Sequence, residues 1–171
     1  MLSLTRKTDY ALVALAALAE GASEDQPLSA ARIARDRHLP AQVLMKVLKN
    51  LQHAGLIAST RGAHGGYYLT RGADRITLGA VIDATEGAAR LTPCCVEDQA
   101  DACLACQTLP RCTIRQGMRQ INERLHALFE KITLGDLLAS DFGDRLARIT
   151  LSEAQRSQPL QEHETALHVT S

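Results

Sequence analysis

Apolar residues recur at helical spacing over most of the first half of the chain. The pattern predicts a first helix over residues 5–20, with Gly21 as its C-terminal stop. A second helix is expected over residues 30–37. A third is expected to begin at Pro40, which suits the first turn of a helix, and to end near residue 54.

Two short extended segments follow these helices. They cover residues 56–60 and 67–70 and lie on either side of a glycine-rich turn, which predicts a β-hairpin. Three helices and a hairpin in this order predict a winged helix-turn-helix fold in a mainly α chain. A further helix is expected over residues 78–86, with Thr77 as its cap and Gly87 as its end.

A long helix is predicted over residues 113–132. Its apolar residues follow one another at intervals of 4, 3, 4, 3 and 4, which is a heptad-like seam: Ile114, Met118, Ile121, Leu125, Leu128 and Ile132. A helix of this length beside a small domain should bury such a seam against a partner, so we expect a homodimer.

Four parts of the chain are therefore expected. They are a winged-helix domain over residues 1–80, a linking helix and cysteine-rich loop over residues 81–112, a dimerisation helix with a short terminal helix over residues 113–140, and a disordered tail over residues 151–171.

Composition agrees with this picture. Hydrophobic residues make up 46% of the chain, aromatic residues only 3%, and there is no Trp, so the core must be built from aliphatic side chains. No stretch approaches the roughly 20 apolar residues of a membrane span, and no signal peptide is evident. We expect a cytoplasmic protein without membrane contact.

Charge is divided unequally along the chain, although the net charge is zero. Residues 1–80 hold ten Lys or Arg residues against six Asp or Glu residues, and the remainder holds nine against thirteen. A mildly basic first half suits a head that binds nucleic acid, with double-stranded DNA as the expected partner.

The third predicted helix has an apolar face and an opposite face that suits base edges and phosphates. The lysines suit phosphates or guanine, the glutamine suits adenine, and an arginine in the hairpin turn could enter a minor groove. The candidate DNA-binding residues are Gln42, Met45, Lys46, Lys49, Arg61 and His64. The alternative is ordinary amphipathic packing with solvated lysines.

All five cysteines lie in a window of 19 residues, from Cys94 to Cys112. Clustering of this kind in a cytosolic chain favours metal binding or redox chemistry, and thiolates are preferred by iron–sulfur clusters and by zinc. The Cys103-x-x-Cys106 pair alone would also suit a structural zinc site or a reversible disulfide. No thioredoxin-like pattern and no nucleophile with a placed base accompany it, so we do not expect an enzyme.

Four segments of the sequence resemble the Rrf2 family, the IscR-like winged-helix regulators, over about residues 1–140. They are LTRKTDYAL at residues 4–12, AGLI at 54–57, RGAHGGY at 61–67 and ITLGDL at 132–137. The resemblance is greatest to the branch that regulates the SUF iron–sulfur assembly operon. It implies a homodimeric regulator that binds a palindromic operator, with the third helix in the major groove. Members sense iron–sulfur or iron status, nitric oxide or redox state.

The resemblance also implies a set of metal ligands. Family members carry three cysteines, the last two separated by five residues just before the long helix. Cys106 and Cys112 fit that spacing, and Cys94 fits the first position. Cys95 and Cys103 are additional, so Cys95 could replace Cys94 and Cys103 could replace Cys106.

The fourth ligand departs from the IscR pattern. Members with a 2Fe-2S cluster carry a histidine three positions after the last cysteine, where this chain has Arg115, which stays protonated. NsrR-type members place a carboxylate from the other subunit at the position of Asp9. The resemblance thus favours a 4Fe-4S over a 2Fe-2S cluster, held by three cysteines and Asp9. Alternatively, Asp9 is an acid favoured by the dipole of its own helix.

Overall fold

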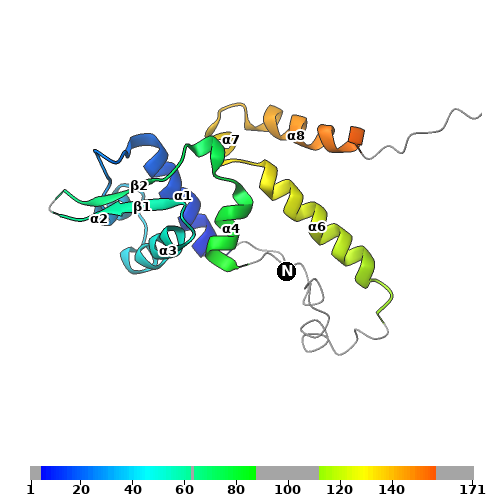
Figure 1. The fold of residues 1–171 in the computed structure, drawn as a ribbon, viewed down its shortest axis with the longest axis horizontal. Helices are drawn as coiled ribbons and strands as arrows, with labels where there is room; N and C mark the ends of the chain where they lie inside the picture. Colours follow the sequence, from blue (N-terminus) through cyan, green and yellow to red (C-terminus); the bar gives the residue numbers. More distant parts are fainter. Residues whose placement is uncertain (1–4, 63, 88–111, 157–171) are drawn as a thin grey trace, which may run out of the picture.

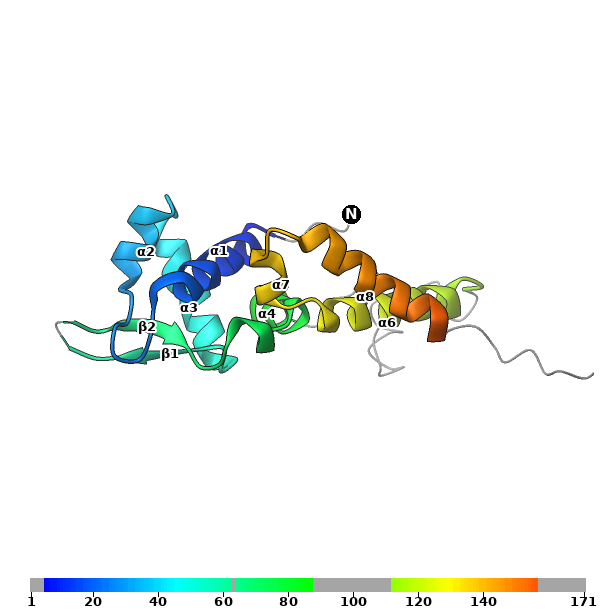
Figure 2. The ribbon, with the colours of Figure 1, turned by 90° about the horizontal axis from the view of Figure 1, so that it is seen from above.

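The computed structural model describes residues 5–62, 64–87 and 112–156, the side chains of residues 152–156 excepted. Figure 1 shows its elements, whose bounds are α1 Arg6–Gly21, α2 Ala30–Asp36, α3 Ala41–His53, β1 Ile57–Thr60, β2 Gly66–Leu69, the 3-10 turn η1 Ala73–Arg75, α4 Leu78–Glu86, α6 Arg115–Lys131, α7 Leu134–Leu138 and α8 Phe142–Arg156. We call the elements from α1 to α4, together with α7, the head. Helices α6 and α8 extend from one side of the head (Figures 1 and 2).

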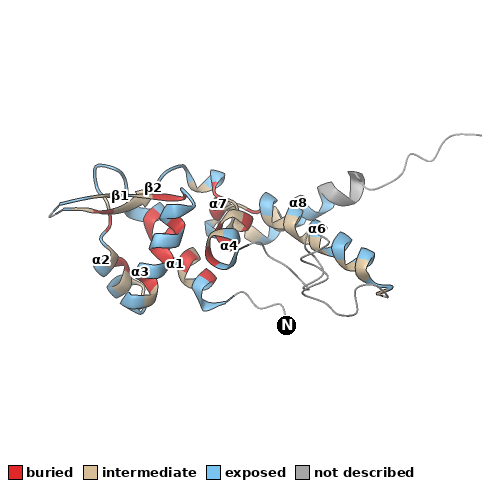
Figure 3. Cartoon of the chain, turned by 60° about the horizontal axis from the view of Figure 1, so that its bottom comes forward, coloured by how far each residue is buried: buried red, intermediate tan, exposed pale blue. Residues whose placement is uncertain are grey.

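The hydrophobic core lies in the head and is centred on α1. This helix contacts α3, α4, α7 and β2. The most deeply buried side chains of α1 and α3 are aliphatic and have no exposed surface: Ala11, Ala14, Leu15, Leu18, Leu44, Leu48 and Leu51. Figure 3 shows the buried residues gathered in the head. The expected core of aliphatic side chains is confirmed.

Strands β1 and β2 form the wing, an antiparallel pair in which Ile57 lies opposite Leu69. The segment before α2 adds a third contact, because Tyr67 N donates to Leu28 O at 2.8 Å and Leu28 N donates to Tyr67 O at 3.0 Å. A Cβ on Gly66 would lie 2.5 Å from the carbonyl carbon of Leu28, so only glycine allows this approach. The wing is thus anchored to the head by backbone contacts.

The base of α6 is attached to the head by backbone hydrogen bonds on both sides of residue 133. Leu78 N donates to Ile132 O, and Leu134 N donates to Ile76 O, each at 2.8 Å. A capping box then starts α7, because Thr133 Oγ1 accepts from Asp136 N and the Asp136 carboxylate accepts from Thr133 N, both at 3.0 Å. The position of α6 relative to the head is therefore fixed at this end.

The structure confirms the predicted winged helix and its elements. Every predicted helix and strand boundary up to the end of α6 lies within two residues of the observed one. Thr77 caps α4 by accepting from Ala80 N at 3.1 Å, and Gly87 ends that helix. Among the described residues, no helix is long and apolar enough to cross a membrane.

The tail expected from residue 151 was wrong at its beginning, because α8 runs through Arg156. Asp141 pairs with Arg145 at 2.8 Å and with Arg148 at 3.6 Å, and these pairs support the first turns of the helix. Arg145 also pairs with Asp136 of α7 at 3.2 Å, which attaches α8 to the head. Residues 157–171 lie outside the described residues.

Helix α6 has an apolar seam but no buried residue along its length. At the end that lies far from the head, Ile114 is 65% exposed and Ile121 is 54% exposed, whereas Ile132 at the base is buried. Figure 3 shows the change from the buried head to the half-buried and exposed α6. The described part of the chain therefore covers the seam predicted from the heptad spacing only in part.

Candidate nucleic-acid interface

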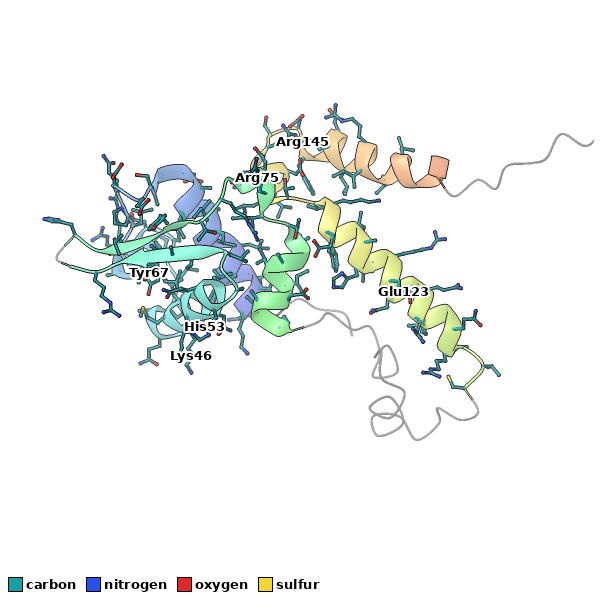
Figure 4. All side chains as sticks on the ribbon, in the orientation of Figure 1. Lys46, His53, Tyr67, Arg75, Glu123 and Arg145 are labelled. Carbon is teal, nitrogen blue, oxygen red and sulfur yellow. The ribbon has the colours of Figure 1, made fainter. Side chains whose placement is uncertain are left out.

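The outer face of α3 is exposed over its whole length. Leu44, Val47, Leu48 and Leu51 face the core, as predicted, while Gln42, Met45, Lys46 and Lys49 are all exposed. Figure 4 shows the side chains of Lys46 and His53 projecting from α3 away from the rest of the head. The structure thus divides this helix into the two faces that its sequence predicts.

The turn between α2 and α3 determines how this face is presented. His38 has a φ of 53°, a left-handed conformation that reverses the chain after α2. Leu39 N donates to Ala34 O at 2.8 Å, which closes the turn. Pro40 is the N-cap residue of α3, and no side-chain hydrogen bond caps the first N–H groups of this helix.

The wing lies beside the C-terminal end of α3. Gln52 Nε2 donates to Ser59 Oγ at 3.0 Å and links the two elements directly. Arg61 and His64 are exposed in the wing turn, which is closed by a 3.0 Å bond from Gly65 N to Gly62 O. Gly62 has a φ of 120°, a conformation that side chains disfavour. Ala63 lies outside the described residues.

The charged residues in the stretch of sequence that contains α3 and the wing are all of one sign. Residues 37–73, which include all of α3 and the wing, hold five Lys or Arg residues and no Asp or Glu. They are Arg37, Lys46, Lys49, Arg61 and Arg71. Arg37 pairs with Glu20 of α1, whereas Lys46, Lys49 and Arg61 are exposed on the helix and the adjacent hairpin, an arrangement that suits the phosphates of a duplex. The six predicted DNA-binding residues lie on α3 and in the wing turn, and their contact with DNA stays a prediction.

The predicted metal ligands are only partly within the described residues. Asp9 is exposed in the first turn of α1, and Cys112 is a half-buried free thiol shortly before α6. Cys94, Cys95, Cys103 and Cys106 lie outside the described residues. Within the described part, no three His, Cys, Asp or Glu side chains are grouped as a metal site would require. The proposed ligand set therefore stays a prediction.

The structure adds a polar cluster that the sequence did not predict. Thr8 of α1 and Thr85 of α4 are buried, and their hydroxyl oxygens lie 2.8 Å apart. The carboxylate of Glu86 accepts from Thr8 Oγ1 at 2.9 Å and from Thr5 Oγ1. The cluster joins the start of α1, near Asp9, to the end of α4, after which the chain enters residues 88–111.

Comparison with known proteins decides the family. A model of the Rrf2 family, described as iron-dependent transcriptional regulators, matches residues 4–140. The chain belongs to the Rrf2 family. The expectation that it is a transcription regulator and not an enzyme is thereby confirmed.

Several Rrf2 relatives match over most of the chain. The transcriptional repressor NsrR of Streptomyces coelicolor is 30% identical over 147 residues, which cover 86% of this chain and 95% of NsrR. The regulator IscR of Yersinia enterocolitica is 33% identical over 79% of this chain and 78% of its own length. The solved structure of CymR, the global cysteine regulator of B. subtilis, superposes with a TM-score of 0.58 at 31% identity. It covers 80% of this chain and 96% of CymR.

The exposed lysines of α3 in this Rrf2 protein give a prediction about Lys46. If Lys46 contacts a phosphate, Lys46→Gln should weaken duplex binding roughly threefold to tenfold at 0.1 M salt, with little dependence on sequence. It should also lower the salt slope of log Kd by about 1, because one counterion fewer is released. Fluorescence anisotropy with a duplex that the wild-type protein selects from a random-sequence library measures both quantities.

Arg124→Gln is the matched control, because it removes one positive charge from the exposed side of α6, away from α3 and the wing. It should leave the Kd and the salt slope nearly unchanged. Equal losses in the two variants would mean that only net charge matters and would contradict the assignment of α3 as the contact helix.

Proposed function

We propose that the protein is an iron–sulfur-dependent transcription regulator, acting as a repressor, that binds a palindromic operator as a homodimer. The observation that carries this proposal is the face of α3 and the adjacent wing turn, on which Lys46, Lys49 and Arg61 are exposed, on the opposite side of the head from the partly uncovered seam of α6. One end of the molecule is suited to a duplex and the other to a second copy. The name of the NsrR relative supports the repressor role.

In this proposal α3 enters the major groove. Gln42, in the first turn of α3, would reach base edges, and Lys46 and Lys49 would contact phosphates. The wing turn lies beside the same groove, where Arg61 would enter the adjacent minor groove and His64 would contact the backbone. The Gln52–Ser59 hydrogen bond keeps helix and wing at a fixed separation, so the two sets of contacts are made together.

A second copy is the partner that best fits α6. The helix has 17 residues and a seam that the described part of the chain covers only in part, since two of the seam's isoleucines are more than half exposed. The seam of another α6 would cover it, as in a coiled coil. Because the base of α6 is bonded to the head, pairing of α6 would also set the distance between the two α3 helices, on which binding to two half-sites depends.

The donor set of the chain fits an iron–sulfur cluster. Cys112 is a free, half-buried thiol, and thiolates are the preferred ligands of such clusters. We infer that Cys94, Cys106 and Cys112 would hold the cluster together with Asp9 of the partner subunit. Asp9 fits because its side chain is exposed and no described residue forms a salt bridge with it. The bound group would supply a centre sensitive to oxidants, nitric oxide or iron supply.

The residues of the chain would convert occupancy of this site into a change of DNA affinity. With the three cysteines as ligands, residues 88–111 would be constrained between α4 and α6, and Asp9 as a ligand would constrain the start of α1. Release of both would allow the head to turn slightly about its bonded attachment to the base of α6, and so would change the spacing of the two α3 helices.

A second hypothesis retains DNA binding but replaces the iron–sulfur cluster with another sensor. The solved CymR relatives include one from Staphylococcus aureus described as an oxidized form, 25% identical with a TM-score of 0.54. The alternative is therefore a regulator controlled by a zinc ion or by a thiol–disulfide exchange among the five cysteines. The two readings differ in the metal content of the protein purified without oxygen.

Anaerobic purification tests the sensor. The wild-type protein should be brown and contain several iron and sulfide ions per chain. Cys94→Ala, Cys106→Ala and Cys112→Ala should each lose most of both, since each removes a thiolate ligand. Cys95→Ala and Cys103→Ala are the matched controls and should keep them. A colourless protein with zinc, or a metal-free protein with a reversible crosslink, would support the alternative.

The dimer interface is tested by placing a charge in the seam. Ile121→Asp should convert a dimer into a monomer, because an unpaired carboxylate would be buried between two α6 helices. Gln120→Asp introduces the same group on a neighbouring, exposed position and should leave the dimer intact. Sedimentation velocity distinguishes the two masses. A dimeric Ile121→Asp variant would show that the copies associate through another surface.

A further inference from the structure

Four side chains at the junction of α1 and α4 form the cluster that we call the latch: Thr5, Thr8, Thr85 and Glu86. Thr8 and Thr85 are the only polar residues that are buried in the described part of the chain. Buried hydroxyls are tolerated only with hydrogen-bond partners, and here these hydroxyls bond to one another and to a carboxylate. The junction is therefore a specific polar contact in an otherwise aliphatic core.

The hydroxyl protons give the latch a direction. Thr5 and Thr8 each have a single hydroxyl proton, and each donates it to Glu86 Oε1. Because Thr8 gives its one proton to Glu86, Thr85 is the donor in its contact with Thr8 Oγ1, and the same hydroxyl also lies at hydrogen-bond distance from Val81 O at 3.0 Å and Ile82 O at 3.2 Å. The two hydroxyls of α1 thus donate to one acceptor, the Glu86 carboxylate. Burial would raise the pKa of Glu86, but the bonds from Thr5 and Thr8 and the charge of Lys7 outweigh it and lower the pKa below its usual value.

The position of Glu86 is not explained by its own helix. It is the last residue of α4, where an acidic side chain faces the negative end of the helix dipole. At the same time its carboxylate lies at the start of α1, where a negative charge is favoured. The residue is therefore accounted for by the contact between the two helices.

We propose that the latch is a positioning device that fixes the first turn of α1, and with it Asp9, to the point where the chain leaves α4 for the cysteine segment. Glu86 is a positioning residue that touches neither DNA nor a metal. Because α1 packs directly on α3, the latch gives a short route from residues 88–111 to the recognition helix. This role rests on the proposed function, because the latch would transmit a change in the cysteine segment to α1 and from there to α3.

The test removes the acceptor or the buried donor. Glu86→Ala deletes the carboxylate at an exposed position, and Thr85→Val replaces the buried hydroxyl with a methyl group of similar shape. Glu86→Gln retains an acceptor oxygen and should restore part of any loss. Asp83→Ala is the control, because it removes a carboxylate from the same helix on the side that faces His126 of α6.

Two readouts are compared. The first is hydrogen exchange of backbone amides 8–12 in the iron-free protein, which should lose protection roughly tenfold in Glu86→Ala and Thr85→Val and stay at the wild-type level in Asp83→Ala. The second is the ratio of operator Kd values with and without iron. This Kd ratio should be within about twofold of one in Glu86→Ala and Thr85→Val, and should keep its wild-type value in Asp83→Ala. Thermal unfolding identifies any variant that fails to fold.

The outcomes separate this inference from the function on which it rests. Wild-type protection and a wild-type Kd ratio in folded Glu86→Ala and Thr85→Val would overturn the latch. Equal losses in Asp83→Ala would also overturn it, because the effect would then belong to α4 in general. A Kd ratio of one in the wild-type protein would instead overturn the iron-dependent function, while hydrogen exchange would still decide whether the latch holds α1.

Discussion

The packing of α1 is the constraint on which the rest of the molecule depends. With almost no aromatic residues, the chain builds its core from short aliphatic side chains, and these are buried only where several elements meet on one helix. Helix α1 provides this meeting point for α3, α4, α7 and β2. The position of α1 therefore determines the orientation of α3, the attachment of the wing and the point at which the chain leaves α4.

The long helix α6 differs from α1 in that it is not packed into the core. It is amphipathic like α3, yet none of its residues is buried against the described part of the chain. Backbone bonds around Thr133 fix its base, so its seam is held out from the head in a definite direction. A second copy on that seam would place two rigid heads at a defined separation. In the proposed dimer, a small change of angle at the base of α6 would then alter the separation of the two α3 helices without unfolding any element.

Periodicity was sufficient to predict the helices and hairpin of the head, because each buries a regular apolar stripe that leaves a trace in the sequence. Helix α8 was not predicted, although Phe142, Leu146 and Ile149 recur at helical intervals of four and three residues, because charged side chains separate them and Leu151 lies outside the stripe. Those charges are what support the helix, through the pairs of Arg145 and Arg148 with Asp141.

The candidate functional residues likewise include some that the sequence could predict and some that it could not. The exposed face of α3 could be predicted, since it is the complement of a buried stripe. The latch could not, because Thr8 and Glu86 are 78 positions apart and meet only in the folded head. An acidic residue at the C-terminal end of a helix was the single local sign that Glu86 has a tertiary role. The ligand roles of the cysteines rest on spacing and on the family.

The central claim is that DNA affinity responds to the state of the cysteine segment. It is tested most directly by titrating one operator duplex, under strict anaerobiosis, with the wild-type protein before and after its iron is removed by chelation. The account predicts dissociation constants that differ by roughly fivefold or more, within the usual range of coupling between two sites. Equal dissociation constants for two folded dimeric forms would contradict it.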